Sequence, residues 1–345
     1  MKLATYKDGS RDGQLVVVSR DLSLAHYATG AAHTLQQVLD DWNFIAPQLQ
    51  DVSLELNRGR ARHAFAFDPS MCMAPLPRAH QCVRATAYAS HHDTLCDAGL
   101  LPERDRHASL TGKGPRGLAD LCTLAGDAMQ GATDPVHLAD EAWGLDFEAG
   151  LAAITADIPA GCAPARALEG VRLLALANTW CLRELQAHER AQGLSAVQSR
   201  PAQAFSPVAV TPDELGDAWA QGRIGLTLQT QWNGRRVGLC DAATDMTLHL
   251  GQLLAQVAAT RALRAGTVVT TGPISCPGVG EGTARQWPQG FHTIVEKRAM
   301  DVLQQGQATT GYLRWGDTVR LDMKGRDGLS LMGALAQQVQ ETAQA

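Results

Sequence analysis

The triplet His91-His92-Asp93 is the part of this chain best suited to moving protons. Imidazole titrates near neutrality, and a neighbouring carboxylate raises its basicity, so His91 could act as acid or base with Asp93 orienting it. The same triplet on a loop is also typical of a solvated polar turn. On these residues alone, the polar turn is the favoured interpretation.

The eight cysteines show no spacing that points to a metal site or a disulfide framework. None forms a Cys-x-x-Cys pair, and the two closest stand ten residues apart. Zinc sites need clustered Cys or His ligands, and disulfide frameworks belong to small exported chains. We expect most of these cysteines to be small buried apolar residues. The run Gly278-Val-Gly-Glu-Gly282 lacks the Lys-Ser/Thr of a phosphate-binding loop and carries little weight.

The elements that must position such residues show no regular βαβ alternation, which predicts an α+β fold rich in antiparallel strands. Residues 1–20 predict a hairpin around an Asp-Gly turn. Residues 34–58 have helical periodicity that Pro47 should break or kink, and residues 84–135 have little periodicity. Further strands are expected at 145–155, 224–232, 266–274, 291–299 and 317–323, and helices at 164–178 and 246–260.

Composition bounds the class of protein. The 345 residues are 45% hydrophobic and 19% charged, as expected for a globular chain, and the net charge of −5 is scattered. There is no basic patch for nucleic acid, and no apolar run approaches the roughly 20 residues that span a bilayer. The N-terminus has no hydrophobic signal core, so we expect a cytoplasmic protein.

A proline-rich segment at 67–77 marks a boundary between two parts of the chain. We expect a small N-terminal α+β subdomain at 1–75, a catalytic-type domain at 76–335 and a tail at 336–345.

Several motifs spread along nearly the whole chain resemble the fumarylacetoacetate hydrolase family, in its bacterial branch. They are Pro75-Leu-Pro-Arg-Ala79, Leu138-Ala-Asp-Glu-Ala-Trp-Gly-Leu-Asp-Phe-Glu148, Phe205-Ser-Pro-Val-Ala-Val-Thr-Pro-Asp-Glu-Leu-Gly216, Asn233-Gly234, Asp245-Met-Thr247 and Gly316-Asp-Thr-Val-Arg320. The resemblance implies mixed, mostly antiparallel β-sheets in a roll or sandwich, and a homodimer.

Family members hold a divalent cation, usually magnesium or calcium, with four carboxylates. The resemblance places the first ligand at Arg84, the Glu-x-Glu pair at Glu148 and Gly150, and the last ligand at Thr179. Only Glu148 is a carboxylate. Hard cations need several oxygen ligands, so we expect no dedicated metal site and no cofactor. If Arg84 faces Glu148, a buried ion pair could occupy the former metal volume.

Other family positions are retained. By resemblance, His91 matches a general base, Asp93 its orienting carboxylate, and Arg183 and Gln186 residues that face the substrate. Arg200 stands where the family has a lysine, and keeps the positive charge with a different geometry. The alternative for Arg183 and Arg200 is a surface salt bridge.

Two further departures surround these positions. Pro273, in Thr271-Gly-Pro-Ile274, replaces a threonine that the family presents to its substrate. Cys82, Cys181 and Cys276 lie beside altered segments, and a thiol near Arg84 or His91 could be reactive. Filling space left by substituted neighbours is the favoured role for all three.

The sequence leads to three functional hypotheses. The first is a metal-independent enzyme whose His91 performs acid–base chemistry on a small anionic oxo or enol compound, by isomerisation, cyclisation, decarboxylation or C–C cleavage. The second is an inactive relative that binds a ligand or pairs with an active paralogue. The third is an ordinary C–C hydrolase with a weak metal site, ranked last because one carboxylate gives poor cation affinity.

Overall fold

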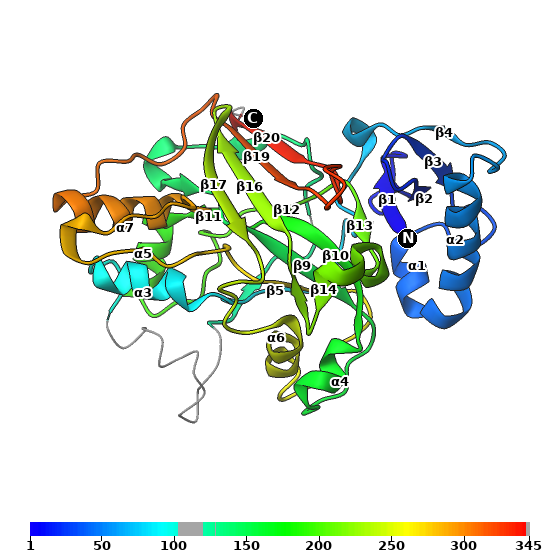
Figure 1. The fold of residues 1–345 in the computed structure, drawn as a ribbon, viewed down its shortest axis with the longest axis horizontal. Coiled ribbons are helices and arrows are strands. Elements are labelled where there is room, and N and C mark those ends of the chain that lie inside the picture. Colours follow the sequence, from blue (N-terminus) through cyan, green and yellow to red (C-terminus); the bar gives the residue numbers. More distant parts are fainter. Residues whose placement is uncertain (103–119, 128, 343–345) are drawn as a thin grey trace.

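The computed structural model describes residues 1–102, 120–127 and 129–342. The chain forms two main β-sheets with helices at the periphery (Figure 1). The larger sheet has the order β4-β3-β2-β1-β13-β10-β9-β18-β5-β6, and β12 pairs with β10. Its strands are β1 (Lys2–Tyr6), β2 (Gln14–Val18), β3 (Leu24–Tyr27), β4 (Phe65–Ala66), β5 (Gln81–Arg84), β6 (Cys122–Leu124), β9 (Ala149–Thr155), β10 (Val171–Asn178), β12 (Ala204–Phe205), β13 (Ala209–Val210) and β18 (Thr267–Thr270).

The second sheet has the order β17-β16-β19-β20-β7. Its strands are β7 (Val136–Leu138), β16 (Thr227–Trp232), β17 (Arg235–Asp241), β19 (Thr318–Met323) and β20 (Leu335–Glu341). Two short pairs join β8 (Leu145–Asp146) to β11 (Cys181–Leu182), and β14 (Trp219–Ala220) to β15 (Arg223–Ile224). Within the described chain, only β18–β5 and β20–β7 are parallel, so the predicted α+β fold with mostly antiparallel sheets is confirmed.

The helices are α1 (Leu35–Asp40), α2 (Trp42–Asn57), α3 (Ala89–Asp97), α4 (Pro164–Leu168), α5 (Arg183–Ala191), α6 (Leu250–Val257) and α7 (Ile294–Gln305). Figure 1 shows α3, α5 and α7 together on one side of the molecule, opposite α1 and α2. In the described part of the chain, no helix is both long enough and apolar enough to cross a bilayer.

The N-terminal hairpin of β1 and β2 is confirmed. Strand β1 also pairs with β13, so the N-terminal segment extends the large sheet. One apolar cluster joins Leu3 and Leu15 of this segment to Leu173 and Val268 of the central strands. The two parts thus share a core. Strand β20 takes up most of the segment that was expected to be a tail, and residues 343–345 lie outside the described residues.

The predicted break at Pro47 is wrong. The helical segment is interrupted at Asp41, whose φ of −130° and ψ of 52° are not helical, and α2 runs through Pro47. Proline removes one helical hydrogen bond, but the apolar face of α2 packs against the sheet, and this burial stabilises the helix. That face includes Ile45, Leu49 and Leu56.

Three other segments also differ from prediction. Residues 171–178 form β10, not helix, because a central strand buried on both faces lacks alternation and resembles a buried helix. Residues 294–299 begin helix α7, where Glu296, Ala299 and Met300 are buried at helical spacing. The segment 84–135 contains α3, although residues 103–119 and 128 lie outside the described part.

Candidate active site

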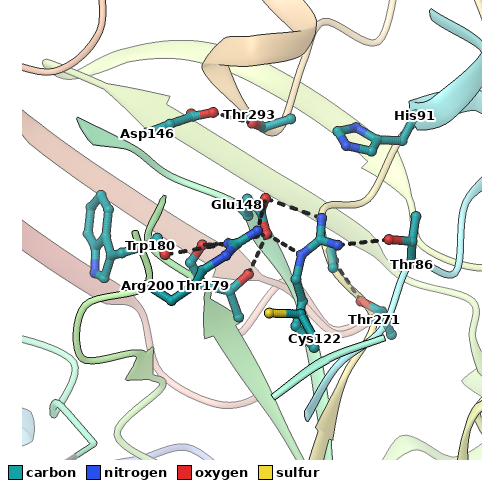
Figure 2. Close-up of polar contacts among 12 residues, drawn as sticks. Thr86, His91, Cys122, Asp146, Glu148, Thr179, Trp180, Arg200, Thr271 and Thr293 are labelled. Carbon is teal, nitrogen blue, oxygen red and sulfur yellow. Dashed lines mark hydrogen bonds and ion pairs between the residues drawn. The ribbon is translucent and has the colours of Figure 1, made fainter. Parts of the chain in front are cut away.

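Glu148 lies at the centre of a cluster of three arginines, namely Arg84, Arg183 and Arg200. Figure 2 shows Arg200 and Thr179 beside Glu148. Its Oε2 accepts hydrogen bonds from Arg84 Nε at 2.6 Å and from the Thr179 hydroxyl at 2.9 Å. Its Oε1 accepts from Nη2 of Arg183 at 2.8 Å, and Nη1 of Arg200 lies 3.0 Å from Oε2. Glu148 is fully buried. We call Glu148 and these three arginines the Glu148 cluster.

The ends of central strands bring this cluster together. Arg84 is the last residue of β5, which pairs in parallel with β18. Glu148 directly precedes β9 and Thr179 directly follows β10, and these antiparallel strands pair Ala149 with Asn178. The Glu148 N–H donates to the side-chain oxygen of Asn178 at 3.1 Å, which fixes the turn on which the carboxylate stands. The positions are therefore set by sheet pairing.

Charge attraction holds the cluster ionised. Burial alone would raise the pKa of Glu148, but Arg200, Arg84 and Arg183 hold it well below its usual range. Burial would lower the pKa of Arg183 and Arg200, whereas Cys181 and the carboxylates beside them raise it. Glu148, Arg183 and Arg200 are therefore charged at neutral pH.

Asp146 is a second buried carboxylate, and the sequence analysis did not single it out. It accepts from Arg183 Nε at 2.8 Å and from the Thr293 hydroxyl at 2.7 Å. It also accepts from the N–H of Ile294, the first residue of α7, at 2.6 Å. A carboxylate at a helix N-terminus is stabilised by the helix dipole. Its position two residues before Glu148 in an extended segment was the available signal, because such residues share one face.

The site does not fit a divalent cation. Two carboxylates, Asp146 and Glu148, face three guanidinium groups, which leaves one net positive charge where a cation would have to bind. A Cβ at Gly150 would lie 2.0 Å from the carbonyl oxygen of Gly272, so backbone fills the place of the second glutamate. Within the described residues, no three Asp, Glu, His or Cys side chains are grouped to hold a metal ion.

His91 pairs with a carboxylate on another helix. Its Nδ1 lies 2.9 Å from Oε1 of Glu296, and both side chains are buried. Asp93 was expected in this role, but it stands two residues from His91 on α3, and side chains at that spacing point in different directions. Glu296 was missed because 291–299 was predicted as a strand. We call these residues the His91–Glu296 pair.

The neighbouring His92 differs in its electrostatics. Burial, with a smaller effect from His91, lowers the pKa of His92 to about 3. His92 is therefore uncharged across the neutral range. Only one of the two adjacent histidines has a carboxylate on its ring among the hydrogen bonds of the described residues.

A cavity of about 830 Å³ opens beside both groups. Its lining includes His91, His92, Gln186 and five arginines, namely Arg84, Arg183, Arg190, Arg200 and Arg298. Among the described residues, the lining carboxylates are Asp120, Glu184 and Glu189, so positive charge is in excess in this part of the lining. The Gln186 side-chain oxygen accepts from Arg183 Nη1 at 3.1 Å. This electrostatic balance favours an anionic ligand.

The three cysteines singled out by the sequence lie in different surroundings. Cys181 is buried in β11 beside the arginine cluster. Cys82 belongs to β5 and is buried in the apolar core, and this burial raises its pKa to about 12. Cys276 Sγ lies 2.6 Å from Cys240 Sγ, and both are free thiols. None of the three lines the cavity among the residues described.

Comparison with known proteins places the fold. Residues 106–340 match the family model for the fumarylacetoacetate (FAA) hydrolase C-terminal domain, and residues 1–78 match fumarylacetoacetase N-terminal domain 2. No curated protein matches the sequence at a significant level.

Solved structures match over the full length. Fumarylacetoacetate hydrolase from psychrophilic Exiguobacterium antarcticum is 22% identical with a TM-score of 0.63, over 99% of this chain and 100% of that one. Maleylpyruvate hydrolase from Sphingobium sp. SYK-6, in complex with manganese(II) and pyruvate, is 16% identical with a TM-score of 0.62 over the same shares.

A probable 2-hydroxyhepta-2,4-diene-1,7-dioate isomerase from Mycobacterium abscessus is 16% identical with a TM-score of 0.66, over 100% of both chains. At these identities the solved structures establish the fold alone. The family model covers most of the chain, and the motifs, sheets and helices agree with it. The chain therefore belongs to the fumarylacetoacetate hydrolase family.

Proposed function

We propose that this protein is a metal-independent enzyme that moves a proton on a small anionic oxo or enol compound. The observation that carries the proposal is the 2.9 Å contact between His91 Nδ1 and Glu296, in a cavity that is also lined by Arg84, Arg183 and Arg200. A proton-transfer group thus lies beside an anion-binding group. Isomerisation is the reaction that we favour, because it requires only proton transfer and charge stabilisation. Cyclisation, decarboxylation and cleavage of an activated C–C bond come after it.

His91 supplies the acid–base chemistry. With Nδ1 held by Glu296, Nε2 is the ring nitrogen that serves a ligand. From a substrate with a C=C bond beside the carbon next to the carbonyl group, it takes a proton from that carbon, which leaves a dienolate. The protonated ring then returns the proton to the far carbon of the dienolate. No atom is gained or lost, so the net change is a double-bond shift.

The arginines supply charge stabilisation. Enolate formation places negative charge on the carbonyl oxygen, and preorganised positive groups lower the energy of that state. Arg84, Arg183 and Arg200 are held in place by Glu148, which lies buried behind them, so they need no rearrangement when charge develops. Their net positive charge takes the part that a metal has in relatives such as the manganese-bound maleylpyruvate hydrolase.

Named relatives support the substrate class. Solved structures with this fold include proteins named as hydrolases and isomerases. The compounds in their names, and the pyruvate bound in one of them, are small oxo or hydroxy acids. This supports an oxo acid as the substrate. A homodimer, as the resemblance implies, completes the proposal.

Hydrogen–deuterium exchange tests it. The purified, EDTA-treated protein is incubated with 2-oxobutyrate in D₂O, and loss of the C3 proton signal is followed by NMR. We expect exchange above the buffer rate without metal, and a loss of about 100-fold or more in His91→Gln. His137→Gln is the matched control, because His137 is exposed on β7. No exchange, or exchange only after magnesium is added, contradicts the proposal.

A second function has its own supporting observation. The arginines of the Glu148 cluster already donate to protein acceptors, including Thr86, Asp146 and Gln186. This arrangement suits a catalytically inactive relative that binds an anion, or pairs with an active paralogue, without turning over a substrate. Binding of 2-oxobutyrate without proton exchange would favour this role.

A further inference from the structure

Two helices lead from the charged part of the cavity to apolar side chains at its rim. Helix α3 carries His91 near its start, and Leu100 and Leu101 follow its end. Helix α5 begins with Arg183, and Leu194 follows its end. All five residues line the same cavity. Each helix has nine residues and so is about 13 Å long, which sets the scale of the separation between the charged and apolar ends.

Strand β6 also leads from the charged part of the cavity to an apolar side chain. Cys122 pairs with Arg84 of β5, and Leu124 stands two residues further along β6. Residues two apart on a strand face the same side and are separated by about 7 Å. Cys122 and Leu124 both line the cavity, and Leu124 is buried. The apolar surface thus extends from the rim into the cavity.

The rim leaves large apolar side chains exposed. Val197 is 75% exposed and Leu194 57%, and the exposed Leu100 and Leu121 line the same cavity. Exposed apolar groups gathered around a cavity are typical of a ligand site. A volume of about 830 Å³ is also far larger than an acid of three or four carbons would fill.

Of the two outer arginines, Arg298 already has protein partners and Arg190 has a carboxylate nearby. Arg298 donates to the Thr310 carbonyl at 2.5 Å and lies over the ring of Tyr312, 4.6 Å from its centre. Burial lowers the pKa of Arg190, and Asp120 opposes this effect as a nearby negative charge. A second carboxylate on the ligand would have to compete with these partners. An apolar group would not.

We propose that the outer part of the cavity is an apolar subsite, and that the ligand is an oxo or enol acid with one carboxylate end and an alkyl or aryl tail. The inference rests on the proposed function, because the Glu148 cluster must hold the acid end. The tail lies along Leu100, Leu121, Leu124 and Leu194, where it removes apolar surface from water.

Calorimetric titration of the whole protein with a chain-length series tests the subsite. The ligands are pyruvate, 2-oxobutyrate, 2-oxohexanoate and 2-oxooctanoate, with 2-oxoadipate as a six-carbon diacid matched to 2-oxohexanoate. We expect Kd to fall about fourfold for each added methylene. We also expect 2-oxohexanoate to bind more tightly than 2-oxoadipate.

A variant pair locates the effect. Leu194→Ser with Val197→Ser should remove most of the gain from chain length and leave pyruvate binding unchanged. Leu329→Ser is the matched control, because Leu329 is a similarly exposed leucine outside this cavity. Both changes are at exposed positions, so folding should be unaffected.

The outcomes separate the two proposals. Affinity that does not depend on chain length, or tighter binding of the diacid, overturns the apolar subsite and leaves the proposed function standing. An unchanged chain-length gain in the double variant also overturns this placement of the tail. Failure of every acid to bind overturns both proposals.

Discussion

The Glu148 cluster and the His91–Glu296 pair border the same cavity, but they use their hydrogen bonds differently. In the cluster, each of the three arginines meets Glu148 and at least one further protein acceptor. In the pair, one contact fixes Nδ1 of His91 and leaves Nε2 for a ligand. The arginines of the cluster are thus bound to protein groups, whereas the pair keeps one ring nitrogen for a ligand. We infer that the cluster positions and stabilises, and that the pair reacts.

The largest expected effect breaks the cluster. Glu148→Gln removes the negative charge from among Arg84, Arg183 and Arg200 and leaves one carboxylate, Asp146, against three buried guanidinium groups. We expect a loss of about 3–5 kcal/mol in the free energy of unfolding, measured by urea denaturation. Glu169→Gln is the control, because Glu169 forms an exposed ion pair with Arg166 that should contribute below about 1 kcal/mol. A loss below about 1 kcal/mol for Glu148→Gln would contradict this account of the cluster.

The next effect concerns the pair. Glu296→Gln keeps the shape of the side chain but loses the charge that orients and stabilises the protonated His91 ring. We expect a decrease of about 10-fold to 100-fold in the exchange rate of 2-oxobutyrate, smaller than that of His91→Gln. A full exchange rate in this variant would remove Glu296 from this role.

Acidification should reduce the stabilisation that Glu148 provides. The pKa of Glu148 in the folded protein lies below the ordinary value of 4.5, so its stabilisation is fully present above pH 4.5 and is lost as the pH falls below it. The stability difference between the native protein and Glu148→Gln should therefore be constant from pH 7 to 5 and shrink toward pH 3. Denaturation midpoints across this range measure it. A difference that grows on acidification would contradict the assigned charge.

The smallest effect is expected at His92. Because burial lowers its pKa to about 3, His92 carries no charge in the working range of the His91–Glu296 pair. His92→Gln should therefore leave the pH midpoint of exchange above pH 5 unchanged, even if packing alters the rate modestly. A displaced midpoint would show that His92 titrates with His91, and the two would then have to be treated as one unit.

The sequence allowed part of this site to be predicted. A contact between Arg84 and Glu148 was a conditional expectation from the family resemblance, and the structure contains it, because both residues lie at the ends of neighbouring strands. The convergence of Arg183 and Arg200 on the same carboxylate was not predicted, because it depends on how a helix start and a loop close over the strands. Glu296 was lost with the wrong secondary structure for 291–299. Spacing alone cannot show which residues separated by 205 positions meet.

The N-terminal hairpin was easier to predict than the central strand β10. Both hairpin strands are buried, but an Asp-Gly turn signal lies between them, and β1 and β2 were predicted correctly. Strand β10 is also buried, and its sequence gives no alternation, so it resembles a buried helix. A turn signal therefore identified strands that their burial alone would not have distinguished from helix.

The close approach of Gly150 and Gly272 makes the loss of the metal-binding pattern difficult to reverse. A glutamate at position 150 would place its Cβ 2.0 Å from the Gly272 carbonyl oxygen, so restoring that carboxylate requires the backbone of another segment to move first. Arg84 and Thr179 would have to change as well. Rebuilding the carboxylate pattern that the family resemblance implies would therefore require several substitutions at once, together with a shift of the backbone around Gly272.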